Sequence, residues 1–264
     1  MAIAGVYLRG FHGGSSYRRA SRTLPGPVGH GVPVDREEIL AVIERASVPG
    51  PSRLEVLGEV PGQPRRVGLV PGSFDPISVA HEALADAVQA DLVVLVWSPA
   101  TLPKEAAAAG PVEPPLLEPE ARIEALLAFT ASRDHQVVAV ASHGRYADQA
   151  EAAATAFPEA EIEVGIGSDK LAQILDPGWY DDRDAALGRL FTVADVAYAV
   201  RAGEEELAER ALAEAPLWAP RFRRIALPSD VAEVSGRAIR ARLRRGEDPS
   251  ALVPSEVRPY LPGA

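Results

Sequence analysis

The 264-residue sequence contains no cysteine. This absence excludes disulfide bonds, metal sites built from thiolates and a cysteine nucleophile. Positive charge is also scarce: 27 Lys and Arg residues stand against 37 Asp and Glu residues, which gives a formal net charge of −10. An acidic surface disfavours sequence-independent binding to nucleic acid or to anionic membranes. Any recognition of phosphate must therefore come from a local site.

Long apolar runs are missing too. No stretch approaches the length of a membrane span, and the opening MAIAGVYLRGF lacks the basic and apolar regions of a signal peptide. We therefore expect a soluble cytoplasmic protein that has neither nucleic acid nor a membrane as a partner.

Two common phosphate-binding fingerprints are not met. The pattern GxxxxGK(S/T) does not occur, and GIGSDK carries only the first two glycines of GxGxxG. His12, His30, His135 and His143 show no metal-ligand spacing, so we expect no metal ion held by the protein's own side chains.

The first 65 residues differ from the rest of the chain. The stretch RGFHGGSSYRRASRTLPGPVGHGVP is rich in Gly, Ser, Pro and Arg and has little periodicity, which is typical of irregular segments. After it, Asp35 is placed to cap a short helix with Ile39, Leu40 and Ile43 on its inner side, and SRLEVLGEV reads as a strand. We interpret residues 1–65 as an N-terminal extension, partly flexible and of unknown function.

From Arg66 onward, short Val- and Leu-rich runs alternate with helical stretches rich in Ala and Glu. Near-continuous apolar strands that alternate with helices indicate a parallel sheet covered on both faces. The sequence thus predicts an α/β fold, a doubly wound (Rossmann-like) sheet over residues 66–264. The expected strands are VGLV, DLVVLVW, QVVAVA, IEVGIG, DVAYAV and RRIAL, and the expected helices span 79–90, 118–131, 147–157, 182–190, 204–215 and 236–246.

The stretch GSFDPISVAH, residues 72–81, lies where the first of these strands meets a helix. Such a junction leaves backbone N–H groups pointing at one space, and with the helix dipole they form an anion site. Gly72 and Ser73 allow a ligand to come close to the backbone. His81 falls in the first helical turn, where its ring can face a bound phosphate; the alternative is a histidine satisfied by local partners.

This stretch resembles the first signature of the nucleotidyltransferase superfamily, G-(G/S)-F-D-P-x-(H/T)-x-G-H. Ser78 stands where the family has His or Thr, and its hydroxyl, like that of the Thr variant, can donate to a phosphate oxygen. Ala80 replaces a glycine and adds a methyl group where the backbone is expected to approach a ligand. The matching positions are Gly72, Ser73, Phe74, Asp75, Pro76 and His81.

A second signature lies far along the chain. EVSGRAIRARLRRGEDPSALVPSEVRPYL is similar to the closing segment of nicotinate and nicotinamide mononucleotide adenylyltransferases, (I/V)-S-S-T-x-(I/V)-R-x-x-(L/I)-x-x-G followed by LVP and V-x-x-Y. Gly236 and Arg237 replace the second Ser and the Thr of that pattern. Ser235 is available as a helix cap, and Arg240 follows one turn in. Such a helix end can hold ATP phosphates from the side opposite His81.

Features between the two signatures follow the order of the same family. SPATLPKE resembles its P-x-x-x-P-x-K loop, with Lys104 as the cation. GIGSDKLAQILDPGWY resembles its G-x-D-x-L strand end, with Asp169 for a ribose or base and Trp179 for stacking. VRAG corresponds to its R-P-G, with Arg201. The resemblance spans residues 66–264.

The resemblance implies a nucleotidyltransferase of NAD biosynthesis, in which a pyridine mononucleotide attacks the α-phosphorus of ATP and releases pyrophosphate. The attacking phosphate is already a nucleophile, so the protein must bring two anions together and stabilise the developing charge. Mg²⁺ would arrive on ATP. The implied roles are catalysis for His81, Ser78, Lys104 and Arg240, ATP binding for Gly72, Ser73, Phe74, Ser235 and Arg237, and mononucleotide binding for Asp169, Trp179 and Arg201.

Several alternatives stay open at this point. The chain could be a transferase of the same fold with a phosphopantetheine or cytidylyl-type acceptor, or a nucleotide-binding regulatory protein that has lost catalysis. Asp75 reads more readily as a structural turn residue, and Lys104 reads equally well as a solvated loop residue. Trp179 reads equally well as core filler, with Tyr180 as an alternative stacker. Two further questions stay open: whether the pyridine is the amide or the acid, and whether the chain forms a homo-oligomer.

Overall fold

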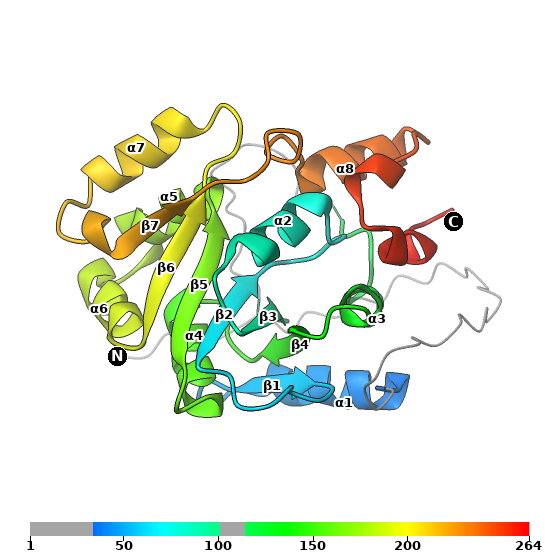
Figure 1. The fold of residues 1–264 in the computed structure, drawn as a ribbon, viewed down its shortest axis with the longest axis horizontal. Coiled ribbons are helices and arrows are strands. Elements are labelled where there is room, and N and C mark those ends of the chain that lie inside the picture. The colour runs from blue at the N-terminus through cyan, green and yellow to red at the C-terminus, as the bar shows by residue number, and fades with distance from the viewer. Residues whose placement is uncertain (1–33, 101–113, 264) are drawn as a thin grey trace.

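The computed structural model describes residues 34–100 and 114–263, so Lys104 lies outside the described part. A seven-stranded sheet runs through the centre in the order β1-β4-β3-β2-β5-β6-β7 (Figure 1). The strands β2 to β7 are parallel, and β1 joins the edge antiparallel to β4. The strands are β1 Leu54–Leu57, β2 Arg66–Pro71, β3 Leu92–Trp97, β4 Gln136–Ala141, β5 Glu161–Gly167, β6 Ala194–Ala199 and β7 Phe222–Ile225.

Helices cover both faces of this sheet, which confirms the doubly wound fold. Successive strand residues point to opposite faces: Val70 packs in one buried cluster with α1, α2 and α3, and Leu69 packs in another with α4 to α7. The α-helices are α1 Arg36–Ser47, α2 Val79–Ala87, α3 Pro119–Thr130, α4 Tyr146–Ala156, α5 Ser168–Leu175, α6 Arg183–Val193, α7 Glu205–Ala213 and α8 Gly236–Arg244. The short 3-10 helices are η1 Pro177–Trp179, η2 Ala219–Arg221, η3 Ser250–Leu252 and η4 Ser255–Tyr260.

The strand order reverses between β2 and β5. From β2 the chain adds β3 and β4 on one side, and from β5 it adds β6 and β7 on the other. The connections that leave the carboxyl ends of β2 and β5 therefore diverge, and open α/β sheets bind ligands in the crevice that this divergence leaves. Residues 72–81 follow β2 directly, so the fold brings them to this crevice.

The α1 helix and β1 lie within the region predicted as an N-terminal extension; β1 is the edge strand of the sheet, and α1 packs against α3 and β4. Asp35 caps α1, since its carboxylate accepts the N–H of Glu38 at 2.8 Å. The predicted inner face of this helix is wrong at one position: Leu40 is 46% exposed, whereas Ile39 and Val42 are buried. Only one narrow stripe of α1 meets α3 and β4, and Leu40 lies outside it.

Two glycines seat α2 close to the sheet. A Cβ added at Gly68 of β2 would lie 2.4 Å from Val88 Cγ1, and one at Gly165 of β5 would lie 2.6 Å from Val88 Cγ2. Val88, the residue that ends α2, thus fills the space that both glycines leave empty. This contact fixes the height of α2 above the strands, and with it the position of His81.

The C-terminal segment packs over the beginning of α2. Val234, Ile239, Val253 and Leu261 form a small buried cluster against which Val79 rests. This cluster holds α8 beside α2, as the ribbon also shows (Figure 1). Among the described residues no helix combines the length and apolar character of a membrane span.

Candidate functional site

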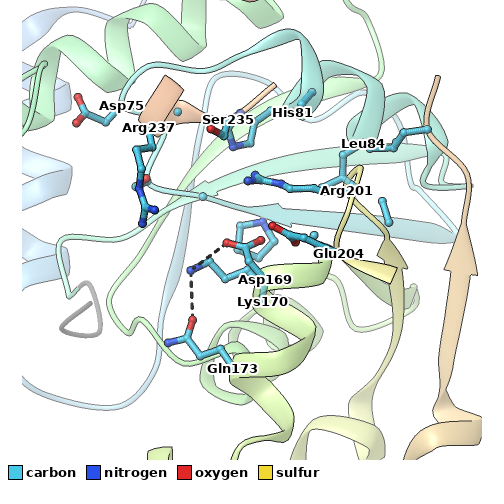
Figure 2. Close-up of a pocket in the computed structure, with 18 of the residues that line it drawn as sticks. Asp75, His81, Leu84, Asp169, Lys170, Gln173, Arg201, Glu204, Ser235 and Arg237 are labelled. Atoms are coloured by element: carbon cyan, nitrogen blue, oxygen red, sulfur yellow. Dashed lines mark hydrogen bonds and ion pairs between the residues drawn. The ribbon is translucent and has the colours of Figure 1, made fainter. Parts of the chain in front are cut away.

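A cavity of about 470 Å³ opens at the carboxyl ends of the central strands. Its lining includes the turn after β2, the start of α5, the turn after β6 and the start of α8 (Figure 2). The two signatures, far apart in sequence, therefore face one space. Of the predicted site residues, the lining includes Gly72, Ser73, His81, Asp169, Arg201, Ser235, Arg237 and Arg240.

His81 presents a neutral hydrogen-bond donor to this cavity. The backbone N–H of Ser78 donates to Nδ1 of His81 at 3.2 Å, and the Ser78 hydroxyl lies 2.8 Å from the same atom. An amide can only donate, so Nδ1 accepts and the ring hydrogen sits on Nε2. Burial, followed by the charge of Arg201, lowers the pKa of His81 to about 4, against a smaller opposite effect of Asp169. The imidazole is therefore uncharged at neutral pH.

Two residues of the first signature, Ser78 and Phe74, do not line the cavity, and Gly72 lines it under a packing constraint. Ser78 is fully buried and bonds to His81, so its hydroxyl orients the ring and does not line the cavity. Phe74, at φ 43°, is buried with its ring centroid 5.2 Å from that of His81. Gly72 lines the cavity, but its N–H donates to Val96 O at 3.0 Å, and a Cβ there would lie 2.9 Å from the Phe74 ring. Gly72 is therefore required by local packing.

Asp75 ties together distant segments around the site. Its buried carboxylate accepts the backbone N–H groups of Leu116 and Leu117 at 2.8 to 3.0 Å. The guanidinium of Arg122 lies 3.7 Å from the same carboxylate. Asp75 thus bonds backbone amides far along the chain in place of the expected local turn.

Another wall of the cavity is the start of α8. Ser235 caps this helix, since its hydroxyl accepts the N–H of Ala238 at 3.2 Å. Arg240 donates from Nη1 to the Asp75 backbone oxygen at 2.9 Å, and Arg237 lines the cavity from an exposed position. A Cβ at Gly236 would lie 3.2 Å from Arg240 Nη1, so the glycine at this family serine position leaves room for that side chain.

The end of β5 supplies the floor of the cavity. It continues directly into α5, a helix that the sequence analysis missed, although the apolar positions of KLAQIL repeat at helical spacing. Asp169 faces the cavity with Lys170, whose Nζ lies 3.9 Å from an Asp169 oxygen and 3.2 Å from Gln173 Oε1 (Figure 2). Trp179, in η1, does not line the cavity, so the structure does not bring it to the other predicted site residues.

The turn between β6 and α7 brings Arg201 and Glu204 to the same space. The Arg201 N–H donates to Ser168 Oγ at 3.1 Å, and that hydroxyl donates to Glu204 Oε2 at 2.5 Å. Figure 2 shows the Arg201 side chain reaching into the space between His81 and Asp169. Neither Glu204 nor Ser168 was identified from the sequence, because only the approach of two loops reveals their pairing.

A second set of lining residues comes from α4 and was also missed. Tyr146 lines the cavity, and burial, with Asp169 and Tyr180 nearby, raises the pKa of its hydroxyl. The phenol therefore keeps its proton and offers a neutral O–H group. Gln149, buried beside it, donates from Nε2 to the backbone oxygen of His143 at 2.9 Å.

The lining mixes both signs of charge. Cations and the His81 donor suit an anion, whereas carboxylates suit hydroxyl or amino donors, so one ligand carrying both kinds of group fits best.

Within residues 34–100 and 114–263, no three His, Asp or Glu side chains gather as they would around a metal ion. The charged lining residues are Lys170, Arg201, Arg237 and Arg240 on the basic side, and Asp75, Asp169, Glu204 and Glu233 on the acidic side.

Comparisons with known proteins agree with this fold. No family model and no curated protein matches the chain. Plasmodium falciparum nicotinic acid mononucleotide adenylyltransferase, solved in complex with APC, is similar with a TM-score of 0.52 at 17% identity, over 74% of this chain and 94% of that one. A candidate nicotinate-nucleotide adenylyltransferase of Vibrio parahaemolyticus aligns over 74% of this chain and 98% of its own at 13% identity, but its TM-score of 0.33 is too low to support a common fold. The resemblance read from the sequence is therefore confirmed at the level of the fold, which this chain shares with the adenylyltransferase of Plasmodium falciparum.

Proposed function

We propose that this protein transfers the adenylyl group of ATP to a pyridine mononucleotide and releases pyrophosphate. One observation carries the proposal: His81 and Arg240, which belong to two separate signatures, line the same cavity at the point where the strand order reverses. The fold shared with a nicotinic acid mononucleotide adenylyltransferase supports the same reaction class.

The chemistry follows from the donors that face the cavity. An oxygen of the mononucleotide phosphate forms a bond to the α-phosphorus of ATP, and the bond from that phosphorus to the pyrophosphate oxygen breaks. Because the attacking phosphate is ionised, no general base is needed. The Nε2–H of His81 donates to an oxygen of the transferring phosphoryl group as negative charge moves onto it.

The cations hold the two anions in place. Arg237 and Arg240 line the cavity from α8 and suit the β- and γ-phosphates, and Arg201 suits the acceptor phosphate. Their positive charge offsets the repulsion between two phosphorylated ligands in one cavity. Mg²⁺ would enter on ATP, held mainly by phosphate oxygens and water.

In this proposal Ser78 holds the His81 ring and does not contact phosphate. Its backbone N–H and its hydroxyl both meet Nδ1 of His81, so it acts as a positioning residue that keeps the ring hydrogen on Nε2. A serine is sufficient here because the amide already fixes the tautomer.

A pyrophosphate-release assay tests the proposal. The purified protein is given Mg²⁺ and ATP with nicotinate mononucleotide, nicotinamide mononucleotide or phosphopantetheine, and separately CTP with a small phosphorylated alcohol. We expect release with a pyridine mononucleotide, slowed about 10²–10³-fold by His81→Ala and retained in His135→Ala, an exposed histidine far from the cavity.

Other outcomes identify the alternatives. Release only with phosphopantetheine or with CTP would replace the acceptor and keep the reaction class. Binding of ATP without turnover on any acceptor would contradict the transferase proposal and favour a regulatory nucleotide-binding protein.

A further inference from the structure

Glu204 lines the cavity and is held in place by a hydrogen bond, but it has no role in the proposed reaction. Its carboxylate lines the cavity beside Arg201 and Asp169 (Figure 2). One carboxylate oxygen, Oε2, accepts the hydroxyl of Ser168 at 2.5 Å. Ser168 is fully buried, so water does not compete for this bond.

The hydrogen bonds of Ser168 leave one arrangement of protons. A serine hydroxyl has a single hydrogen. The Arg201 N–H donates to Ser168 Oγ, so that oxygen is the acceptor there, and its own hydrogen is directed to Glu204 Oε2. The carboxylate is thereby held at one oxygen, and within the described ranges no protein donor bonds to the other oxygen, Oε1.

Oε1 can only accept a hydrogen bond. A phosphate placed beside it would be repelled, more so because Asp169 shares this side of the cavity. The part of a ligand that meets Glu204 therefore carries O–H or N–H groups and no negative charge. The phosphates belong beside His81 and the guanidinium groups of Arg201, Arg237 and Arg240.

We propose that Glu204 accepts a hydrogen bond from a ribose hydroxyl of the bound nucleotide and so selects ribonucleotides over their deoxy counterparts. Carboxylates serve ribose hydroxyls in this way at other nucleotide sites, through a bond that water replaces poorly once the site is filled. The inference rests on the proposed function in so far as the ligand is a nucleotide. It adds a role for a residue outside both sequence signatures.

The substitution Glu204→Gln isolates this bond. The hydroxyl of Ser168 needs an acceptor, so the amide oxygen of the new side chain faces Ser168 and the NH₂ group takes the place of Oε1. An acceptor becomes a donor without a change of shape. Glu205→Gln removes the same charge one residue further on, from an exposed position outside the cavity, and is the matched control.

Isothermal titration calorimetry measures the affinity for each ligand, which is added alone so that no reaction takes place. Wild type, Glu204→Gln and Glu205→Gln are each titrated with ATP, 2′-deoxyATP and 3′-deoxyATP, and with nicotinamide mononucleotide and its 2′- and 3′-deoxy analogues. In wild type and in Glu205→Gln we expect that loss of one hydroxyl weakens binding about tenfold or more. In Glu204→Gln we expect the ribonucleotide to bind as weakly as that deoxy analogue does, so that removal of the hydroxyl no longer lowers the affinity. The ligand that shows this pattern identifies which ribose Glu204 contacts.

Two results would overturn the assignment. Glu204→Gln could bind every ligand as wild type does, or it could weaken ribo and deoxy forms by the same factor. Either result leaves the proposed function standing, because wild type still binds nucleotides. Absence of binding of both ATP and the mononucleotide by folded wild type would instead overturn the proposed function together with this inference.

Discussion

A histidine ring held by two donors on one side can present only its other nitrogen to a ligand. In this protein the Ser78 amide fixes Nδ1 of His81 as an acceptor, and burial, followed by the charge of Arg201, disfavours a positive charge on the ring. His81 thus contributes an oriented, uncharged hydrogen-bond donor, and the surrounding arginines supply the positive charge.

The substitution His81→Ala should lower kcat about 10²–10³-fold with little change in the affinity for ATP, because one preorganised donor to the transferring phosphoryl group is lost. Steady-state kinetics and ATP titration check this. A purely structural His81 would give a variant of reduced melting temperature whose folded fraction turns over normally.

The lowered pKa of His81 predicts a pH dependence of stability. In the unfolded chain the imidazole titrates near 6.5, and in the folded chain near 4. Between these values the unfolded chain binds a proton that the folded chain does not, so stability is complete above about pH 6.5 and falls toward pH 4. From pH 7 to pH 5 we expect wild type to lose about 1–2 kcal/mol more unfolding free energy than His81→Ala. Urea unfolding in phosphate-free buffer measures this; equal losses in both proteins would contradict it.

At the scale of elements, the contact of α2 with the sheet controls the site. Val88 fills the hollow above Gly68 and Gly165, so Gly68→Ala should destabilise the fold by about 1–3 kcal/mol through overpacking. Adding Val88→Ala should recover part of that loss, because the added and the removed methyl groups share one space. A double-mutant cycle in urea checks the coupling, and strictly additive effects would show that α2 is seated elsewhere.

The elements also show how far the sequence alone could lead. The apolar runs predicted β2 to β7, and alternation with helices predicted their layers, because both signals are local. The helix α5 was missed because it follows β5 at Ser168 without an intervening turn residue. The antiparallel place of β1 beside β4 depends on a pairing between residues more than 80 positions apart, which local patterns do not encode.

The candidate site divides in the same way. His81 and Arg240 were found because each lies in a contiguous motif at a helix start. Glu204 and Ser168 belong to no motif, since their bond arises only when the turn after β6 reaches α5. Trp179 was predicted from the resemblance and Ser78 as a substitute for the family's His or Thr, yet neither lines the cavity: Trp179 lies in η1 and Ser78 is fully buried.

For the whole molecule, Arg133 joins three separate segments. Its guanidinium bonds to Glu82 of α2 at 2.5 Å and to Glu256 of η4 at 2.8 Å, and it lies 3.8 Å above the Phe129 ring of α3. Because these partners are partly buried, removal of the cation leaves two carboxylates without their charge partner.

We expect Arg133→Met to lower the unfolding free energy by about 2 kcal/mol. Hydrogen exchange at Val257 should quicken, because η4 loses a link to α2. Arg36→Met, which removes an exposed pair with Glu120 at 2.9 Å, is the control and should change stability by less than about 0.5 kcal/mol. Equal effects of the two substitutions would contradict a joining role for Arg133.

The long separation between the two walls of the cavity has a consequence for a chain in synthesis. His81 leaves the ribosome more than 150 residues before Arg240, and the strands β2 to β7 are all complete by Ile225. A nascent chain can therefore assemble its sheet while the cavity still lacks the wall that α8 supplies. The cavity is therefore completed late, after the core is in place, and any ligand that needs the α8 wall can bind only to the finished chain.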